Sequence, residues 1–110
     1  MTIEFHTGYG KVPEELMDNI RKEILEFSHI NKDISRAEVM LKEDEMIIPS
    51  ENKVCEIRLS VYGDDLLAHS RTESFKRSAK EALKSLKKMV KRQVKNQKEI
   101  PDKTTSTIKI

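Results

Sequence analysis

The segment from Cys55 to Val61 constrains the fold most, because apolar and polar residues alternate along it without a break. The apolar members are Cys55, Ile57, Leu59 and Val61, and the polar members between them are Glu56, Arg58 and Ser60. A period of two places alternate side chains on opposite faces of a strand. One face of this strand is therefore buried and the other meets water, so helices or a second sheet must cover the buried face.

Three shorter alternating runs predict three further strands. These runs are marked by Ile3 and Phe5, by Ala37, Val39 and Leu41, and by Leu66 and Ala68. A turn at Gly63-Asp64-Asp65 precedes the last run and predicts a hairpin with the Cys55–Val61 strand. The acidic stretch from 43 to 52 contains Pro49, and we expect it to be a loop.

Two segments show the spacing of amphipathic helices. The first runs from Pro13 to Ser28, and Val12 before it offers no side-chain cap. The second follows Ser74, which we predict to be its N-cap, and it runs to about Gln97 before Pro101 stops it. The apolar stripe of the second helix consists of Phe75, Ala79, Ala82, Leu83, Leu86, Val90 and Val94.

The order of these elements, β-α-β-β-β-α, predicts an α+β fold. We expect a two-layer sandwich, with a four-stranded sheet and two helices on one face. Residues 1–98 should form a single domain, and the polar residues 99–110 should form a disordered tail. With 36% hydrophobic and 36% charged residues, a chain of 110 residues buries only a thin core. We therefore expect no deep catalytic cavity and no enzymatic activity.

The single cysteine and the N-terminal residues bear on the compartment. Cys55 has no partner for an internal disulfide, which fits a reducing environment. The first residues show no basic segment followed by an apolar run. No stretch approaches the roughly 18 apolar residues of a membrane span. We expect a cytoplasmic protein that does not act at a membrane.

Charge is distributed very unevenly along the chain. From Arg71 to Lys98 there are 11 Lys/Arg and two acids, Glu73 and Glu81, a net charge of +9. The remainder holds 10 basic and 17 acidic residues, a net −7, so the overall +2 conceals a strongly basic last helix. At about 100° per residue, these cations fall largely opposite the apolar stripe. Those that we assign to a binding face are Lys80, Lys84, Lys87, Lys88, Lys91, Arg92 and Lys95.

A cationic face of this density favours binding of a polyanion. Like charges four residues apart destabilise a helix by about 0.2–0.5 kcal/mol per pair, and phosphates remove that repulsion through counterion release. A solvated helix face is the simpler interpretation, but glutamates that normally alternate with lysine are nearly absent. A membrane surface is a competing polyanion, but the opposite face has no Trp anchor and the width of a core-packing stripe. We therefore predict RNA binding.

Other chemistry is weakly supported by the sequence. His6, His29 and His69 have no partner at metal-ligand spacing, so we predict no metal and no cofactor. Cys55 lies on the apolar side of its strand, which indicates a buried structural thiol rather than a nucleophile. No Gly-rich phosphate loop is present, and we expect no small-molecule substrate.

Several segments together resemble the ribosome hibernation-promoting factor family, also called ribosome-associated inhibitors or sigma-modulation proteins. The resemblance covers Met1 to Lys98 and includes the predicted element order. The segments that carry it are Ala37-Glu38-Val39, Cys55 to Val61, Gly63-Asp64-Asp65-Leu66-Leu67-Ala68, Glu73-Ser74-Phe75, Leu83, Leu86-Lys87-Lys88 and Val90.

The resemblance implies a specific function. Family members bind the small ribosomal subunit between its head and body, where they overlap the positions of mRNA and of the A- and P-site tRNAs. They silence idle ribosomes by occupation and not by chemistry. Lys88 and Arg92 match basic residues that face ribosomal RNA in the family, with Lys87 and Lys91 beside them. The chain resembles the short form, which lacks the C-terminal dimerisation domain of long members.

The chain departs from the family pattern at several positions. Glu23 and Glu26 stand on the first helix where lysines are frequent, which weakens the expectation of RNA contacts from that helix. Val12 replaces a capping Thr, Lys80 an acidic residue, and Met89 a Gln. A second hypothesis therefore stays open: a regulatory module whose basic helix contacts an acidic protein partner.

Overall fold

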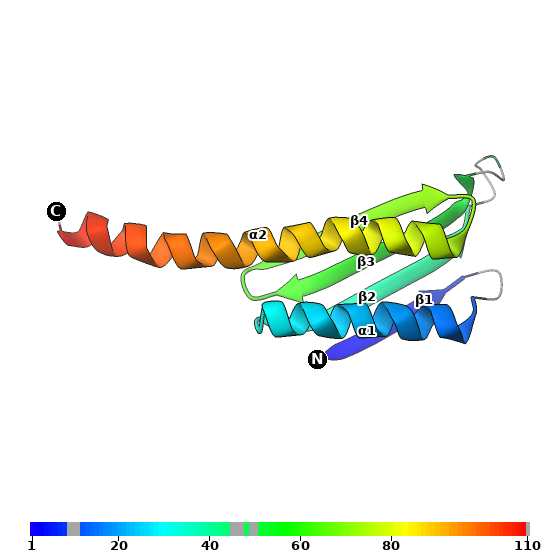
Figure 1. Ribbon diagram of the computed structural model, residues 1–110, viewed down its shortest axis with the longest axis horizontal. Helices are drawn as coiled ribbons and strands as arrows, with labels where there is room; N and C mark the ends of the chain where they lie inside the picture. The colour runs from blue at the N-terminus through cyan, green and yellow to red at the C-terminus, as the bar shows by residue number, and fades with distance from the viewer. Residues whose placement is uncertain (9–11, 45–47, 49–50, 110) are drawn as a thin grey trace.

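A computed structural model of the chain describes residues 1–8, 12–44, 48 and 51–109, with side chains described as far as residue 94. The elements follow the predicted order β-α-β-β-β-α (Figure 1). Their bounds are β1 Thr2–Thr7, α1 Glu14–Ile30, β2 Ile34–Glu43, β3 Lys53–Val61, β4 Asp64–Thr72 and α2 Phe75–Lys109.

The four strands form one mixed sheet in the order β1-β2-β3-β4. β1 runs parallel to β2, with Phe5 opposite Val39, and the other neighbours are antiparallel. A parallel pair needs a long crossover connection, which α1 supplies. Both helices lie on the same face of the sheet (Figure 1). The predicted α+β two-layer sandwich is confirmed.

The core fills the space between the helices and this face of the sheet. Ile24 and Phe27 of α1, Ile57 of β3 and Leu86 of α2 are at most 1% exposed. Cys55 lies in the same layer and is fully buried, so the predicted structural thiol is confirmed. Burial, with a smaller contribution from the Glu56 carboxylate, raises the pKa of this thiol to about 12.

The turn between β3 and β4 comes earlier than predicted. Val61 pairs with Asp64, so Tyr62 and Gly63 form the turn and both aspartates belong to β4. Gly63 adopts a φ of 83°, the left-handed region that a residue with a Cβ rarely enters. The glycine therefore fixes the position of the turn, and the aspartates begin the strand.

The helix boundaries also differ from the prediction. α1 begins at Glu14, and Pro13 is its N-cap without a side-chain hydrogen bond, as the sequence at Val12-Pro13 suggests. The predicted end of α2 near Gln97 is wrong, since the helix continues through Pro101 to Lys109. A proline inside a helix removes one backbone hydrogen bond and costs about 3 kcal/mol relative to alanine. The residues after it can still adopt helical backbone angles, so the helix can continue. The disorder predicted for residues 99–110 stays a prediction.

α2 extends well past the ends of the strands (Figure 1), and the molecule measures 59 × 25 × 17 Å along its principal axes. The predicted turn at 8–11 and loop at 43–52 lie partly outside the described residues. In the described part of the loop, the Asp44 backbone N–H donates to the Asn52 carbonyl oxygen at 2.8 Å. Neither described helix combines the length and apolar content that crossing a membrane requires.

Candidate nucleic-acid interface

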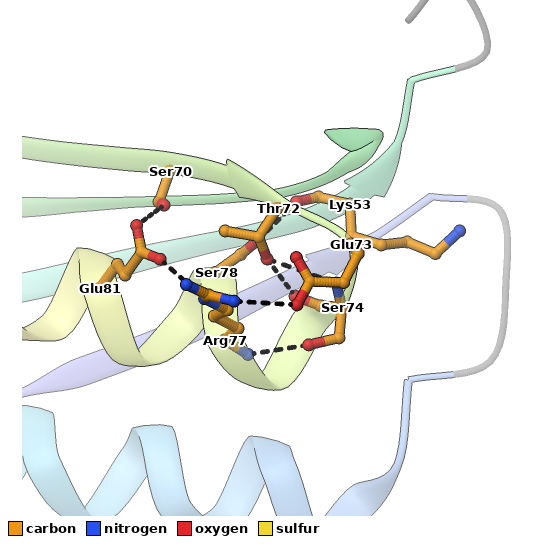
Figure 2. Close-up of polar contacts among 8 residues, drawn as sticks. All are labelled: Lys53, Ser70, Thr72, Glu73, Ser74, Arg77, Ser78 and Glu81. Atoms are coloured by element: carbon orange, nitrogen blue, oxygen red, sulfur yellow. Dashed lines mark hydrogen bonds and ion pairs between the residues drawn. The ribbon is translucent and has the colours of Figure 1, made fainter. Parts of the chain in front are cut away.

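The first turn of α2 is fixed by hydroxyl groups at the end of β4 (Figure 2). Ser74 Oγ accepts a hydrogen bond from the Arg77 backbone N–H at 3.2 Å, which confirms the predicted N-cap. Thr72 Oγ1 donates to the Ser74 carbonyl oxygen at 2.8 Å and accepts from the Ser74 N–H at 3.3 Å. These bonds set the direction in which the helix leaves the sheet.

Ser78 joins the same turn to the sheet from inside the core. Its fully buried Oγ donates to the Lys53 carbonyl oxygen at 2.5 Å and lies 2.7 Å from Thr72 Oγ1. Lys53 begins β3 and Thr72 ends β4, so two hydroxyls connect both strands to α2 (Figure 2). Sequence analysis did not identify this contact. The available signal was a serine among the apolar residues on the buried side of the helix.

The predicted binding residues lie along the solvent side of α2. We call the described ones the cationic strip: Lys80, Lys84, Lys87, Lys88, Lys91 and Arg92, all of them exposed. Lys95 lies on the same helix, beyond the described side chains. Among the described residues, no carboxylate forms an ion pair with any member of the strip. The strip thus carries six cations on one helix, and none of them is in an ion pair with a described residue.

Two glutamates and an arginine form a network at the N-terminal end of α2, next to the strip (Figure 2). Arg77 Nη1 lies 3.2 Å from Glu73 Oε1, and Arg77 Nε lies 3.4 Å from Glu81 Oε2. Glu81 Oε1 also accepts a hydrogen bond from Ser70 Oγ of β4 at 3.1 Å. We call Glu73, Arg77 and Glu81 the α2 clamp. Hydrogen bonding to Glu73 is the main cause that raises the pKa of Arg77.

Acidic residues also border the strip on the side of α1. Glu23 and Glu26 share a groove of about 390 Å³ with Lys22 of their own helix and with Lys76 and Lys80 of α2. The apolar floor of this groove includes Leu16, Ile20, Ala79 and Leu83. Phosphate that approaches the strip from the α1 side would meet these carboxylates.

The chemistry available at this site is electrostatic. Backbone phosphates need exposed, unpaired cations on a rigid element, and the strip provides them. Within the described ranges, no group of three His, Cys, Asp or Glu side chains is placed to hold a metal ion. The predicted buried thiol, Cys55, lies in the core and away from the strip.

The fold and the strip together define a class of protein: a small α+β domain that presents one long cationic helix to solvent. The chain belongs to the family described as Sigma 54 modulation protein / S30EA ribosomal protein, whose model matches residues 3–98. The resemblance drawn from the sequence is confirmed. This is a family of ribosome-associated factors and not a known class of enzymes.

Two solved structures share the fold. The ribosomal subunit interface protein of Coxiella burnetii is similar with a TM-score of 0.70 and 12% identity over 84% of this chain and 96% of its own. The N-terminal domain of Thermus thermophilus Protein Y is similar with a TM-score of 0.68 and 17% identity, over 84% and 98% of the two chains. A comparison with curated protein sequences returns no match.

Proposed function

We propose that this protein is a hibernation factor that binds ribosomal RNA of the small subunit through the cationic strip. In that position it blocks the sites of mRNA and tRNA, so it inhibits translation by occupation and needs no cofactor, metal or small-molecule substrate. Residues 1–98 act as a single ribosome-binding domain. Its place of action is the cytoplasm, where ribosomes work.

The observation that carries the proposal is the unpaired charge on α2. Surface lysines usually have carboxylates three or four residues away to offset them, and Lys87, Lys88 and Arg92 have none within the described side chains. The buried hydroxyls of Thr72 and Ser78 hold the helix against the sheet, so the cations keep a fixed geometry. A rigid row of cations suits a backbone whose phosphates are themselves regularly spaced.

Family membership supports the choice of polyanion. The family is associated with ribosomes, and one structural neighbour is described as a ribosomal subunit interface protein. Lys87, Lys88, Lys91 and Arg92 are the residues that we expect to contact ribosomal RNA first. Lys80, Lys84 and Lys95 extend the same contact toward both ends.

Co-sedimentation with purified small subunits over a salt series tests the proposal. Six phosphate contacts predict a slope of log affinity against log salt of about −4 to −5. The variant Lys87→Glu/Lys88→Glu/Lys91→Glu/Arg92→Glu should stay in the supernatant while its circular dichroism spectrum remains that of the folded wild type. A wild type that does not pellet at low salt, or a variant that pellets equally well, would reject ribosome binding. Either result would point instead to an acidic protein partner.

A further inference from the structure

Arg77 differs from the other cations of α2. Among the described side chains of this helix it is the one that carries ion pairs, and both of its partners are glutamates four residues away. It is nevertheless well exposed, since 63% of its side chain is accessible. Ser70 holds Glu81 from the neighbouring strand, so the α2 clamp is anchored to the sheet as well as to the helix.

The clamp lies directly beside the strip. Arg77, Glu73 and Glu81 line a shallow hollow of about 510 Å³ together with Ser74, Lys76, Lys80 and Lys84. A free guanidinium at this place would lengthen the strip by one phosphate contact, and an Arg binds phosphate in bidentate fashion. The two carboxylates instead neutralise it and place negative charge where a longer run of phosphates would lie.

We propose that Glu73 and Glu81 are specificity-determining residues, which withhold Arg77 from RNA and so remove one phosphate contact from the binding surface. The inference rests on the proposed RNA-binding role of the strip. An interface gains selectivity when it penalises competitors as well as when it favours its target. A shorter strip binds RNA of arbitrary sequence less tightly, because each phosphate contact adds affinity without regard to sequence.

The opposite face of the sheet offers a matched control. Arg36 Nη2 lies 2.8 Å from Glu4 Oε2 and 3.2 Å from Glu38 Oε1, again one arginine between two glutamates. Glu38 lies beside Val39, whose buried side chain points to the helices, so Glu38 points away from them. We call Glu4, Arg36 and Glu38 the sheet clamp. Replacement of Glu4 and Glu38 with Gln changes the net charge by the same amount as replacement of Glu73 and Glu81, but on the face of the sheet that α2 does not cover.

The test measures binding of a short RNA duplex of arbitrary sequence and of purified small subunits, each over a salt series. Glu73→Gln/Glu81→Gln should bind the duplex about five- to tenfold more tightly at 0.1 M salt, the gain from one added phosphate contact. The gain on small subunits should be smaller, so selectivity for the subunit falls. Glu73→Gln/Arg77→Gln/Glu81→Gln, which removes the same acids and also the arginine, should lose the gain.

Three results would overturn the inference: no gain in the double variant, an equal gain in the triple variant, or an equal gain in Glu4→Gln/Glu38→Gln. An equal gain on duplex and subunit would overturn the claim of specificity. The proposed function is read separately, from wild-type binding to small subunits. A wild type that ignores subunits while the double variant gains on the duplex rejects the ribosome as target and supports the action of the clamp.

Discussion

At the scale of single residues, small polar groups at buried positions determine how α2 meets the sheet. Ser78 and Thr72 are 0% and 8% exposed, and each hydroxyl has a partner within the network at the end of β4. A buried hydroxyl without a partner is unfavourable, so this network is selective for the observed geometry. The orientation of the cationic strip therefore depends on Thr72 and Ser78, which are buried and are not themselves part of the strip.

Replacement of Ser78 tests this dependence. Ser78→Ala removes the hydrogen bond to the Lys53 carbonyl oxygen and leaves that part-buried acceptor with one partner fewer. We expect the free energy of unfolding to fall by about 1–3 kcal/mol. The exposed serine Ser85 lies on the same helix, so Ser85→Ala is the control and should change it by less than about 0.5 kcal/mol. Urea denaturation followed by circular dichroism measures both, and equal losses would refute a structural role for Ser78.

The thiol of Cys55 makes stability depend on pH in the alkaline range. Its pKa is about 12 in the folded protein against an ordinary 9.0, mainly because of burial. Above pH 9 the unfolded chain releases this proton while the folded chain keeps it, so the free energy of unfolding falls as pH rises. Between pH 8 and pH 10 we expect a loss of about 1.4 kcal/mol that is absent from Cys55→Ala. Urea titrations of both proteins at the two pH values give the difference, and parallel losses would contradict it.

At the scale of elements, periodicity predicted the strands because burial on one face requires alternation. The Cys55–Val61 run is buried at each odd position, as its sequence demands. Boundaries followed local backbone preferences instead: Gly63 placed the turn by its positive φ, and Pro101 did not end α2. The α2 clamp was not predicted, although the spacing of four between Glu73, Arg77 and Glu81 in the sequence was a signal for it. Its anchor on Ser70 gave no such signal, because that contact joins residues from two different elements.

The outer part of α2 is expected to contribute little to the domain. Among the side chains of α2 that are described, up to residue 94, the last fully buried one is Val90, and Val94 is half-buried. An isolated helical segment without tertiary packing is marginal in water. Removal of residues 99–110 should therefore leave the urea midpoint unchanged, and limited proteolysis of the intact protein should cut within those residues first. A lower midpoint in the truncated protein would show that the segment packs on the domain.

At the scale of the whole molecule, the two faces of the sheet have different charge. On the helix side, the cationic strip lies on the outer surface of α2. The open side carries both acids and bases, including Glu56 and Arg58, together with the exposed apolar residues Met40 and Leu67. Screening limits the reach of a surface charge to about 8 Å at physiological salt. We therefore expect charges on the open side to have little influence on binding at the strip.

Reversal of one charge on the open side tests this independence. Arg58 is exposed and pairs with no carboxylate among the described residues, so Arg58→Glu breaks no ion pair. We expect its affinity for small subunits at 0.15 M salt to stay within about twofold of wild type, because Arg58 lies on the open face of the sheet and salt screens surface charges. Lys88→Glu, which makes the same change of charge on the strip, should lose at least about tenfold. Comparable losses in both variants would mean that RNA also contacts the sheet.

The position of α2 after all four strands affects when a newly made molecule becomes competent to bind. The antiparallel strands β2, β3 and β4 are close in sequence, so we expect them to pair before α2 is synthesised. Their apolar face is then covered only when α2 docks. Chains fold from the N-terminus as they are synthesised. A growing chain therefore has no docked cationic strip until Val90 and the residues around it have left the ribosome. On the proposed function, a nascent chain therefore cannot bind a small subunit through the strip before α2 has docked on the sheet.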